Sequence, residues 1–401
     1  MSADGASVGR PRVLIPMVRP VFEPDDALMA TLRTSLERGV VSNNGPLVQR
    51  FEREAAAWLG VPEVVAVSTG AHGLLLPLQA LGLRGKVVLP SFTYLATLSA
   101  VTLNGLEPVF CDIDEDTFTL DPEALARVLA RESGVAAVLA VNAYGVPPDL
   151  EALADLTARA GAQLLYDNAH GFGTSQAGRR LPVEPIFQMI SLHATKVMPA
   201  VEGGLVVSPD ARLLARVRRL RAHGVAPDPF DSTPGLNAKM CEMHAAVGLH
   251  SLARFDEALG RRRAYAARLR EALSSHGGVY RVQRVPEGVC SNFQNLAVRV
   301  VAGPTVDADD VVAAFARHGV EARRYFHPPL HRLAMFRQPV SLPRTDEASA
   351  SLVCLPLHSR MDEHDLAGIE RAAGAVAREL VPQVGSHRAR RAHRPRAATR
   401  P

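Results

Sequence analysis

Residues 64–113 read VVAVSTGAHGLLLPLQALGLRGKVVLPSFTYLATLSAVTLNGLEPVFCDI, and this stretch alternates between two kinds of segment. Short apolar runs rich in valine are separated by longer segments that have the composition of helices. Strands that are buried on both faces have this nearly continuous apolar character. Strand–helix–strand repeats at this spacing are typical of a parallel sheet covered by helices.

The alternation continues as far as residue 208 and contains seven strand-like runs. They are 64–69, 86–91, 107–113, 136–142, 163–167, 187–193 and 203–207. We therefore predict an α/β fold built on a mostly parallel, seven-stranded sheet.

Two of the intervening helices carry clear start signals. Asp121 precedes Pro122, which places a capping carboxylate before a first-turn proline. Asp149 precedes a second helical segment that we expect to stop at Gly161. Residues 26–39 predict one more helix, within an N-terminal arm.

The composition of the sequence changes after residue 209, where segments rich in Arg, Ala and Leu predict long helices as far as about residue 275. Mixed short strands and helices follow. We predict a large domain over 1–255 that includes the arm, a smaller α+β domain over 256–381, and a disordered basic tail over 382–401.

Charge and composition exclude several classes of function. The formal net charge is +4, but residues 386–401 hold six arginines and no acid, so the rest of the chain is at −2 and a nucleic-acid-binding role is not expected. No uncharged apolar run reaches the ~18 residues of a membrane span, and the N-terminus lacks an apolar signal region. The four cysteines are far apart, so we expect neither a disulfide framework nor a zinc site and favour the cytoplasm.

Polar residues gather where the predicted strands end, which is where open α/β sheets bind ligands. Ser68-Thr69-Gly70-Ala71 opens a helix, Tyr94 follows the second run, and Asp167 ends the fifth. Ser191, His193 and Lys196 follow the sixth. Taken singly, each has a plainer explanation as a helix cap, a core ring or a surface charge.

Together these features suit pyridoxal phosphate. Its phosphate needs donors at a helix N-terminus, and its ring needs an aromatic face. The ring nitrogen needs a carboxylate, and the aldehyde needs a lysine whose pKa can be lowered. The histidines have no zinc-enzyme spacing, and His327 and His331 flank two prolines, so we expect no metal.

Seven blocks of the sequence resemble one family in order. The most specific are SLHATKVMPAVEGG at 191–204 and YDNAHGFG at 166–173, and the others are 43–52, 64–74, 87–97, 235–249 and 323–331. The chain resembles, over about residues 13 to 380, the DegT/DnrJ/EryC1/StrS sugar aminotransferases, which have the aspartate aminotransferase-like fold (fold type I). The resemblance implies pyridoxal phosphate as cofactor, with pyridoxamine phosphate as its aminated form.

The resemblance also implies roles for individual residues. Lys196 matches the lysine that bonds the cofactor and moves a proton, and Asp167 matches the carboxylate that pairs with the pyridine nitrogen. The other matches are Tyr94 on the stacking ring, His170 near the phenolic oxygen, Gly70, Ala71 and Ser191 at the phosphate, and Asn237 reaching the phosphate of the neighbouring subunit. This last role implies a homodimer with shared active sites.

The chain departs from the family pattern at two places. Ser68-Thr69-Gly70-Ala71 stands where the family usually reads S-G-T after its first strand, so a threonine hydroxyl is lost and backbone amides or Thr69 would have to hold the phosphate instead. Asn168 stands where alanine is common. Lys196 argues against the related dehydratases, which have a histidine at that position.

The activity that the resemblance implies is transfer of an amino group from L-glutamate or glutamine to a keto carbon of a nucleotide-linked deoxysugar. The expected acceptor is C4 of a dTDP-4-keto-6-deoxyhexose, in an amino-sugar pathway for a natural product or a surface sugar. A 3-keto sugar and a cyclitol ketone remain alternatives. A non-enzymatic regulator on the same fold is disfavoured because Lys196, Asp167 and Tyr94 are all present.

Overall fold

The computed structural model describes residues 15–20, 22, 24–180, 185–303, 306–336 and 339–380, so the tail predicted at 382–401 lies outside the described residues. Within these ranges no helix combines the length and the hydropathy that crossing a membrane requires.

The larger part of the molecule is built on a seven-stranded sheet, whose order is β1-β8-β7-β5-β4-β2-β3. The strands are β1 (Val65–Val67), β2 (Lys86–Pro90), β3 (Glu107–Cys111), β4 (Val135–Val141), β5 (Gln163–Asp167), β7 (Gln188–Ser191) and β8 (Gly204–Val207). Six of them run in one direction, and β8 alone is reversed because it pairs antiparallel with both β7 and β1. The predicted seven-stranded, mostly parallel sheet is confirmed.

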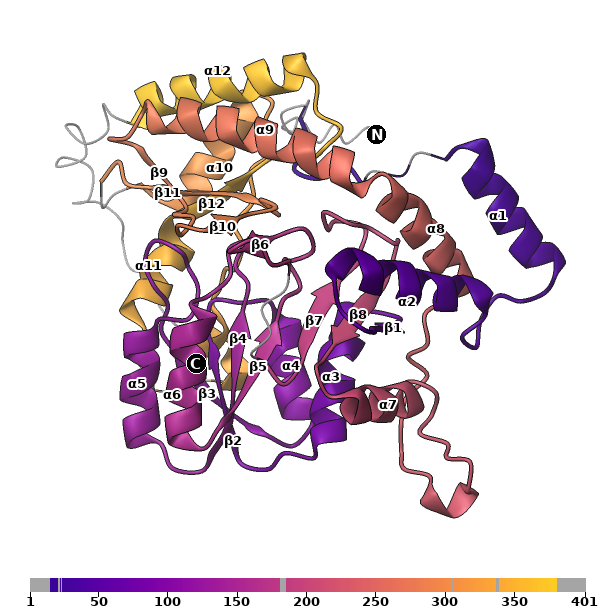
Figure 1. The fold of residues 1–401 in the computed structure, drawn as a ribbon. Helices are drawn as coiled ribbons and strands as arrows, with labels where there is room; N and C mark the ends of the chain where they lie inside the picture. Colours follow the sequence, from indigo (N-terminus) through magenta and orange to yellow (C-terminus); the bar gives the residue numbers. More distant parts are fainter. Residues whose placement is uncertain are drawn as a thin grey trace, which may run out of the picture.

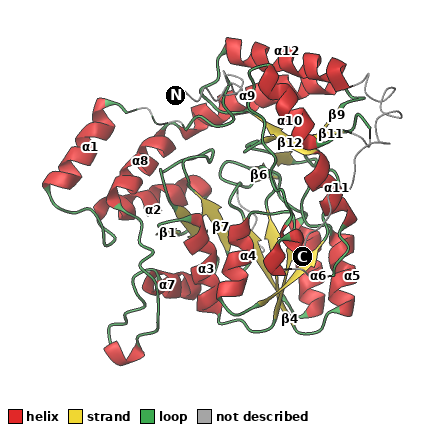
Figure 2. Ribbon diagram, turned by 180° about the vertical axis from the view of Figure 1, so that it is seen from behind, coloured by secondary structure: helices red, strands yellow, loops and turns green. Residues whose placement is uncertain are grey.

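Helices cover both faces of this sheet (Figures 1 and 2). One face packs against α3 (Gly70–Leu81), α4 (Leu95–Leu103) and α7 (Ala211–Leu220). The other face packs against α2 (Pro46–Leu59), α5 (Pro122–Arg131), α6 (Leu150–Ala160) and α8 (Glu242–Ala253). The strands are therefore buried on both sides, which explains their continuous apolar sequences.

The expected capping signals are present. The Asp121 carboxylate accepts a hydrogen bond from the Glu123 amide at the start of α5, and Pro122 occupies the first turn. The Asp149 carboxylate accepts from the Ala152 amide, and α6 ends at Gly161 with a φ of 67°. A left-handed residue at this point favours glycine, because a side chain would be strained.

A smaller part lies over one end of the large sheet and has its own core (Figure 1). Its antiparallel sheet has the order β12-β11-β9, formed by β9 (Tyr280–Val282), β11 (Leu296–Val300) and β12 (Leu352–Leu355). The helices α9 (Phe255–Ser274), α10 (Ala308–Arg317) and α12 (Glu363–Leu380) pack on it. The predicted α+β character is confirmed, while the boundary at 255 stays a prediction.

The remaining elements are short or peripheral. They are α1 (Asp26–Glu37), α11 (Pro343–Ser351), the pair β6 (Ser175–Gln176) and β10 (Val289–Cys290), and three turns of 3-10 helix at Pro229–Asp231, Leu330–Arg332 and Ala334–Phe336. β6 and β10 join residues of the large part to the segment that leads into β11.

Candidate active site

A cavity of about 420 Å³ opens at the edge of the large sheet where β2, β5 and β7 end. Because β1 runs in the same direction as these strands, the N-terminus of α3 reaches the same edge. Seven of the eight residues singled out in the sequence line this cavity: Gly70, Ala71, Tyr94, Asp167, His170, Ser191 and Lys196. The assembly of these residues is a finding, and their individual roles remain predictions.

The first turn of α3 and the end of β7 form one wall of the cavity. The amides of Gly70 and Ala71 lie in the first helical turn, where no intrahelical acceptor exists. The Ser191 side chain faces them closely, since a Cβ added to Gly70 would lie 3.2 Å from the Ser191 hydroxyl. This wall of Gly70, Ala71 and Ser191, the anion cup, can bind an anion through two amides, a hydroxyl and the helix dipole.

A second close approach explains the glycine that starts β8. A Cβ added to Gly204 would lie 2.9 Å from the Thr69 carbonyl oxygen and 3.1 Å from the Gly70 Cα atom. Backbone atoms cannot move aside as a flexible side chain can. Gly204 is therefore required for the N-terminus of α3 to sit in this position.

Asp167 lies at the end of β5 and is 4% exposed. Its carboxylate accepts hydrogen bonds from the Thr97 hydroxyl at 2.7 Å and from the Ala169 amide at 3.1 Å. Burial raises the pKa of Asp167, while these two hydrogen bonds and the charge of Lys196 oppose the rise. A buried carboxylate that opens onto a cavity is suited to pairing with a cationic ligand group.

Lys196 lies in the connection between β7 and β8, and its side chain is open only in part. Burial lowers the pKa of Lys196 to about 8, and the negative charge of Asp167 opposes this shift. At pH 7 about a tenth of its amines is therefore unprotonated, which is the state that attacks a carbonyl.

His170 faces the cavity as a neutral donor. Its Nδ1 accepts a hydrogen bond from the Tyr144 amide at 3.1 Å. Burial and the charge of Lys196 hold the pKa of His170 well below its usual value. The neutral ring therefore carries its proton on Nε2. Phe326 lies nearly parallel to the His170 ring, at a centroid distance of 6.3 Å.

Three other residues considered from the sequence, Tyr94, Thr69 and Asn237, are exposed, occupied as a helix cap or outside the cavity. Tyr94 caps the start of α4 and is 68% exposed in the single chain. Thr69, considered as a substitute phosphate donor, lines the cavity but its hydroxyl accepts from the His72 amide as a helix cap. Asn237 does not line this cavity and instead accepts a hydrogen bond from the Lys239 amine at 2.5 Å. The chain does not bring Asn237 to its own site, so its role stays untested.

Thr97 and Gln294 are among the residues of the site that were not identified from the sequence. Thr97 lies one helical turn beyond Thr93, and their hydroxyls are 2.9 Å apart, so a chain of hydroxyls leads to Asp167. Gln294 comes from the segment before β11 and also lines the cavity. The spacing of the two threonines was a usable signal for Thr97, whereas nothing local marks Gln294.

The arrangement of donors fits pyridoxal phosphate. The anion cup at Gly70 and Ser191 suits a phosphate, and the buried Asp167 carboxylate suits a protonated pyridine nitrogen. The neutral His170 can donate to a phenolate, and the Lys196 amine can bond an aldehyde.

Comparisons with known proteins point to one family. Residues 23–372 match the sequence model of the DegT/DnrJ/EryC1/StrS aminotransferase family. A dTDP-4-amino-4,6-dideoxy-D-glucose transaminase of Escherichia coli is 27% identical over 357 residues, which are 87% of this chain and 95% of that protein.

Two solved structures are also similar. DesI, determined in the presence of its TDP-sugar product, has a TM-score of 0.85 and 34% identity, covering 95% of this chain and 96% of that chain. DesV of S. venezuelae, determined in complex with a ketimine intermediate, has a TM-score of 0.80 and 28% identity, covering 88% and 94%.

Proposed function

Because the chain belongs to the DegT/DnrJ/EryC1/StrS aminotransferase family, whose members depend on pyridoxal phosphate, we propose that its acceptor is a nucleotide-linked deoxysugar. The amino group comes from L-glutamate or glutamine and moves to C4 of a dTDP-4-keto-6-deoxyhexose. The donor leaves as the matching 2-oxo acid, so one C–N bond is broken and one is formed, without net oxidation.

One observation carries this proposal. The partly neutral Lys196 amine and the buried Asp167 carboxylate face one cavity, together with an anion cup. The choice of sugar is supported by two relatives named dTDP-4-amino-4,6-dideoxy-D-glucose transaminase and by DesI, whose product is a TDP-sugar.

The residues of the chain divide the work. When bound, the cofactor supplies an aldehyde that carries nitrogen and a ring that withdraws electrons from the reacting carbon. The buried Asp167 carboxylate would hold the ring nitrogen in its protonated form. His170, whose Nδ1 accepts from the Tyr144 amide, would donate from Nε2 to the phenolic oxygen. The Lys196 amine accepts the proton of the donor carbon and returns a proton to the acceptor carbon.

The test separates the two substrates. The cofactor-loaded protein is incubated with L-glutamate and assayed for 2-oxoglutarate, freed of donor, and then given dTDP-4-keto-6-deoxyglucose. We expect an amino sugar by mass spectrometry with nitrogen on C4 by NMR. Lys196→Met should give neither product, whereas Lys86→Met should behave as the wild type because Lys86 pairs with Glu132 away from the cavity.

The outcomes bear on different parts of the proposal. Formation of 2-oxoglutarate without the amino sugar would contradict the acceptor and direct attention to 3-keto sugars and cyclitol ketones. Failure to form 2-oxoglutarate from L-glutamate and 2-oxoglutaramate from glutamine, in protein that binds the cofactor, would contradict an amino-acid-dependent aminotransferase.

We also propose a homodimer with shared active sites. Large apolar side chains are exposed on α1 and on the loop after α7, among them Leu36, Val225 and Phe230, which is 97% exposed. These segments and Tyr94 would be covered by a second copy, and Asn237 would enter the neighbouring cavity. The free cysteines Cys111, Cys241, Cys290 and Cys354 are compatible with a proposed cytoplasmic location.

Mixing two inactive variants tests the shared site. Lys196→Ala and Asn237→Asp are unfolded, mixed and refolded together. Random pairing of equal amounts makes about half of the dimers mixed, and one of the two sites in each mixed dimer receives both wild-type residues. Activity should therefore return to about a quarter of the wild-type level. Mixtures that stay as inactive as the separate variants would show that Asn237 serves its own chain.

A further inference from the structure

The connection that carries Lys196 is closed at its base by the backbone. The Ala194 amide donates to the Val201 carbonyl at 2.8 Å, and the Ala200 amide donates to the Leu192 carbonyl at 2.8 Å. The Lys196 amide itself donates to the His193 carbonyl at 2.8 Å. At the tip, the groups that flank Lys196 bond to a side chain from a distant part of the sequence.

That side chain is Gln294, which is 6% exposed. Its Oε1 accepts from the Val197 amide at 3.1 Å, and its Nε2 donates to the Thr195 carbonyl at 3.0 Å. One amide therefore bonds the residue before Lys196 and the residue after it. We propose that Gln294 is a positioning residue that fixes the backbone on both sides of Lys196 and so sets the place of its amine.

Gln294 can do this because it is itself held in place. Its carbonyl accepts from the guanidinium of Arg262, a buried residue of α9, at 2.6 Å. Its amide donates to the Asn292 side chain at 2.8 Å. The Asn292 side chain in turn donates to the carbonyls of His170 and Phe172, at 2.7 and 2.8 Å. The segment before β11 thus ties helix α9 to the loops that carry Lys196 and His170.

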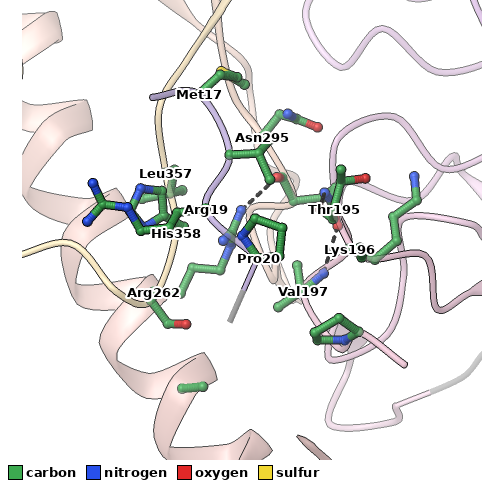
Figure 3. Close-up of a pocket in the computed structure, with 16 residues that line it drawn as sticks. Met17, Arg19, Pro20, Thr195, Lys196, Val197, Arg262, Asn295, Leu357 and His358 are labelled. Carbon is green, nitrogen blue, oxygen red and sulfur yellow. Dashed lines mark hydrogen bonds between the residues drawn. The ribbon is translucent and has the colours of Figure 1, made fainter. Parts of the chain in front are cut away.

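The space behind Lys196 shows why such a restraint is needed. A cavity of about 30 Å³, large enough for a water molecule, lies between Pro20, Arg262 and Val197. In Figure 3 the Lys196 side chain points away from Arg262, so this cavity backs the loop rather than receiving the amine. Without Gln294, the loop has room to relax and the freed peptide groups can bond to water. Lys196 would then become more solvated, and its pKa would rise from about 8 towards 10.5.

The inference rests on Lys196 being the reactive amine of the proposed function, but its test uses the protein without cofactor or substrate. Gln294→Leu removes both hydrogen bonds at similar volume. Gln283→Leu is a matched control, because Gln283 is 4% exposed and its Nε2 donates to the carbonyls of Thr117 and Ala143, at 2.7 and 3.0 Å. Both variants lose a buried glutamine between the same two parts of the molecule.

Two readouts report on Lys196. Hydrogen exchange gives the protection of the Val197 amide, and competitive acetylation with peptide mass spectrometry gives the labelling midpoint of Lys196. For Gln294→Leu we expect exchange at Val197 to accelerate about tenfold or more and the midpoint to rise by about one pH unit or more. For Gln283→Leu we expect neither change, although both variants lose stability.

The proposal is overturned if folded Gln294→Leu keeps the wild-type midpoint, or if Gln283→Leu shifts it equally. Should Gln294→Leu fail to fold, Gln294→Glu takes its place, since it keeps an acceptor for the Val197 amide but loses the donor to Thr195. It should release the Thr195 side of the loop and leave Val197 protected. Equal loss of protection on both sides would contradict the assigned contacts.

Discussion

Replacing Asp167 with asparagine will lower the pKa of the Lys196 amine below its already depressed value of about 8. Burial disfavours the charged ammonium, and the negative charge of Asp167 partly restores it. Asparagine keeps the shape of the side chain and removes the charge, so burial then acts unopposed. A mutation that removes an acid therefore makes a neighbouring base weaker.

The magnitude follows from the depressed pKa. At pH 8 about half of the Lys196 amines are neutral, whereas a lysine at its ordinary pKa of 10.5 is neutral in about 0.3% of molecules. At this pH Lys196 should react about 150-fold faster than an exposed lysine of the same intrinsic reactivity. In Asp167→Asn the neutral fraction at pH 8 exceeds half.

The assay can follow every lysine separately, because the sequence contains only Lys86, Lys196 and Lys239. Acetic anhydride labels the cofactor-free protein in competition with a reference amine from pH 6 to pH 11, and peptide mass spectrometry resolves the sites. Lys86 is an internal reference, because its hydrogen bond to Glu132 raises its pKa. A Lys196 midpoint near that of Lys86, or a higher midpoint in Asp167→Asn than in the wild type, would refute the reasoning.

Three further predictions concern stability and cofactor binding. Lys196→Met should raise the free energy of unfolding of the cofactor-free protein in urea by at most about 3 kcal/mol at pH 7. Because the folded-state pKa of about 8 lies below the unfolded value, this gain in stability should shrink from pH 8 to pH 10.5, and a gain that grows with pH would contradict burial as its cause. Thr97→Val removes a donor to Asp167 and should weaken pyridoxal phosphate binding about tenfold in a fluorescence titration, whereas Thr157→Val, which loses a buried hydroxyl bond inside α6, should not. Gly204→Ala should displace the N-terminus of α3 and weaken cofactor binding, whereas Gly260→Ala, which meets open space in α9, should leave binding unchanged; equal affinities would show that the cup tolerates the shift.

The sheet could be predicted from the sequence because burial on both faces leaves a continuous apolar signature. The direction of β8 could not, since apolar composition is the same in parallel and antiparallel strands. The gap of nine residues between the predicted runs 187–193 and 203–207 was the available hint, because a crossover between parallel neighbours needs about a dozen residues or more. The two-residue strands β6 and β10 were missed because they are too short to show a period.

The candidate site was predictable where residues stand at strand ends, as Asp167 and Ser191 do. It was not predictable where a contact joins distant segments. Gln294 reaches Val197 across 97 positions of the sequence, and no local pattern distinguishes this glutamine from a surface residue. The family resemblance is confirmed by the match over 23–372, while the role of Asn237 depends on a second chain.

The reversed strand β8 also bears on the order in which the molecule folds. The hairpin of β7 and β8 is local, so the segment with Lys196 can form early and at little cost in loop closure. The anion cup requires β1 to join β8, which pairs Val65 with Val206 across most of the large part. Cofactor capture is therefore expected only at the last stage of refolding, when the two ends of the sheet's sequence have met.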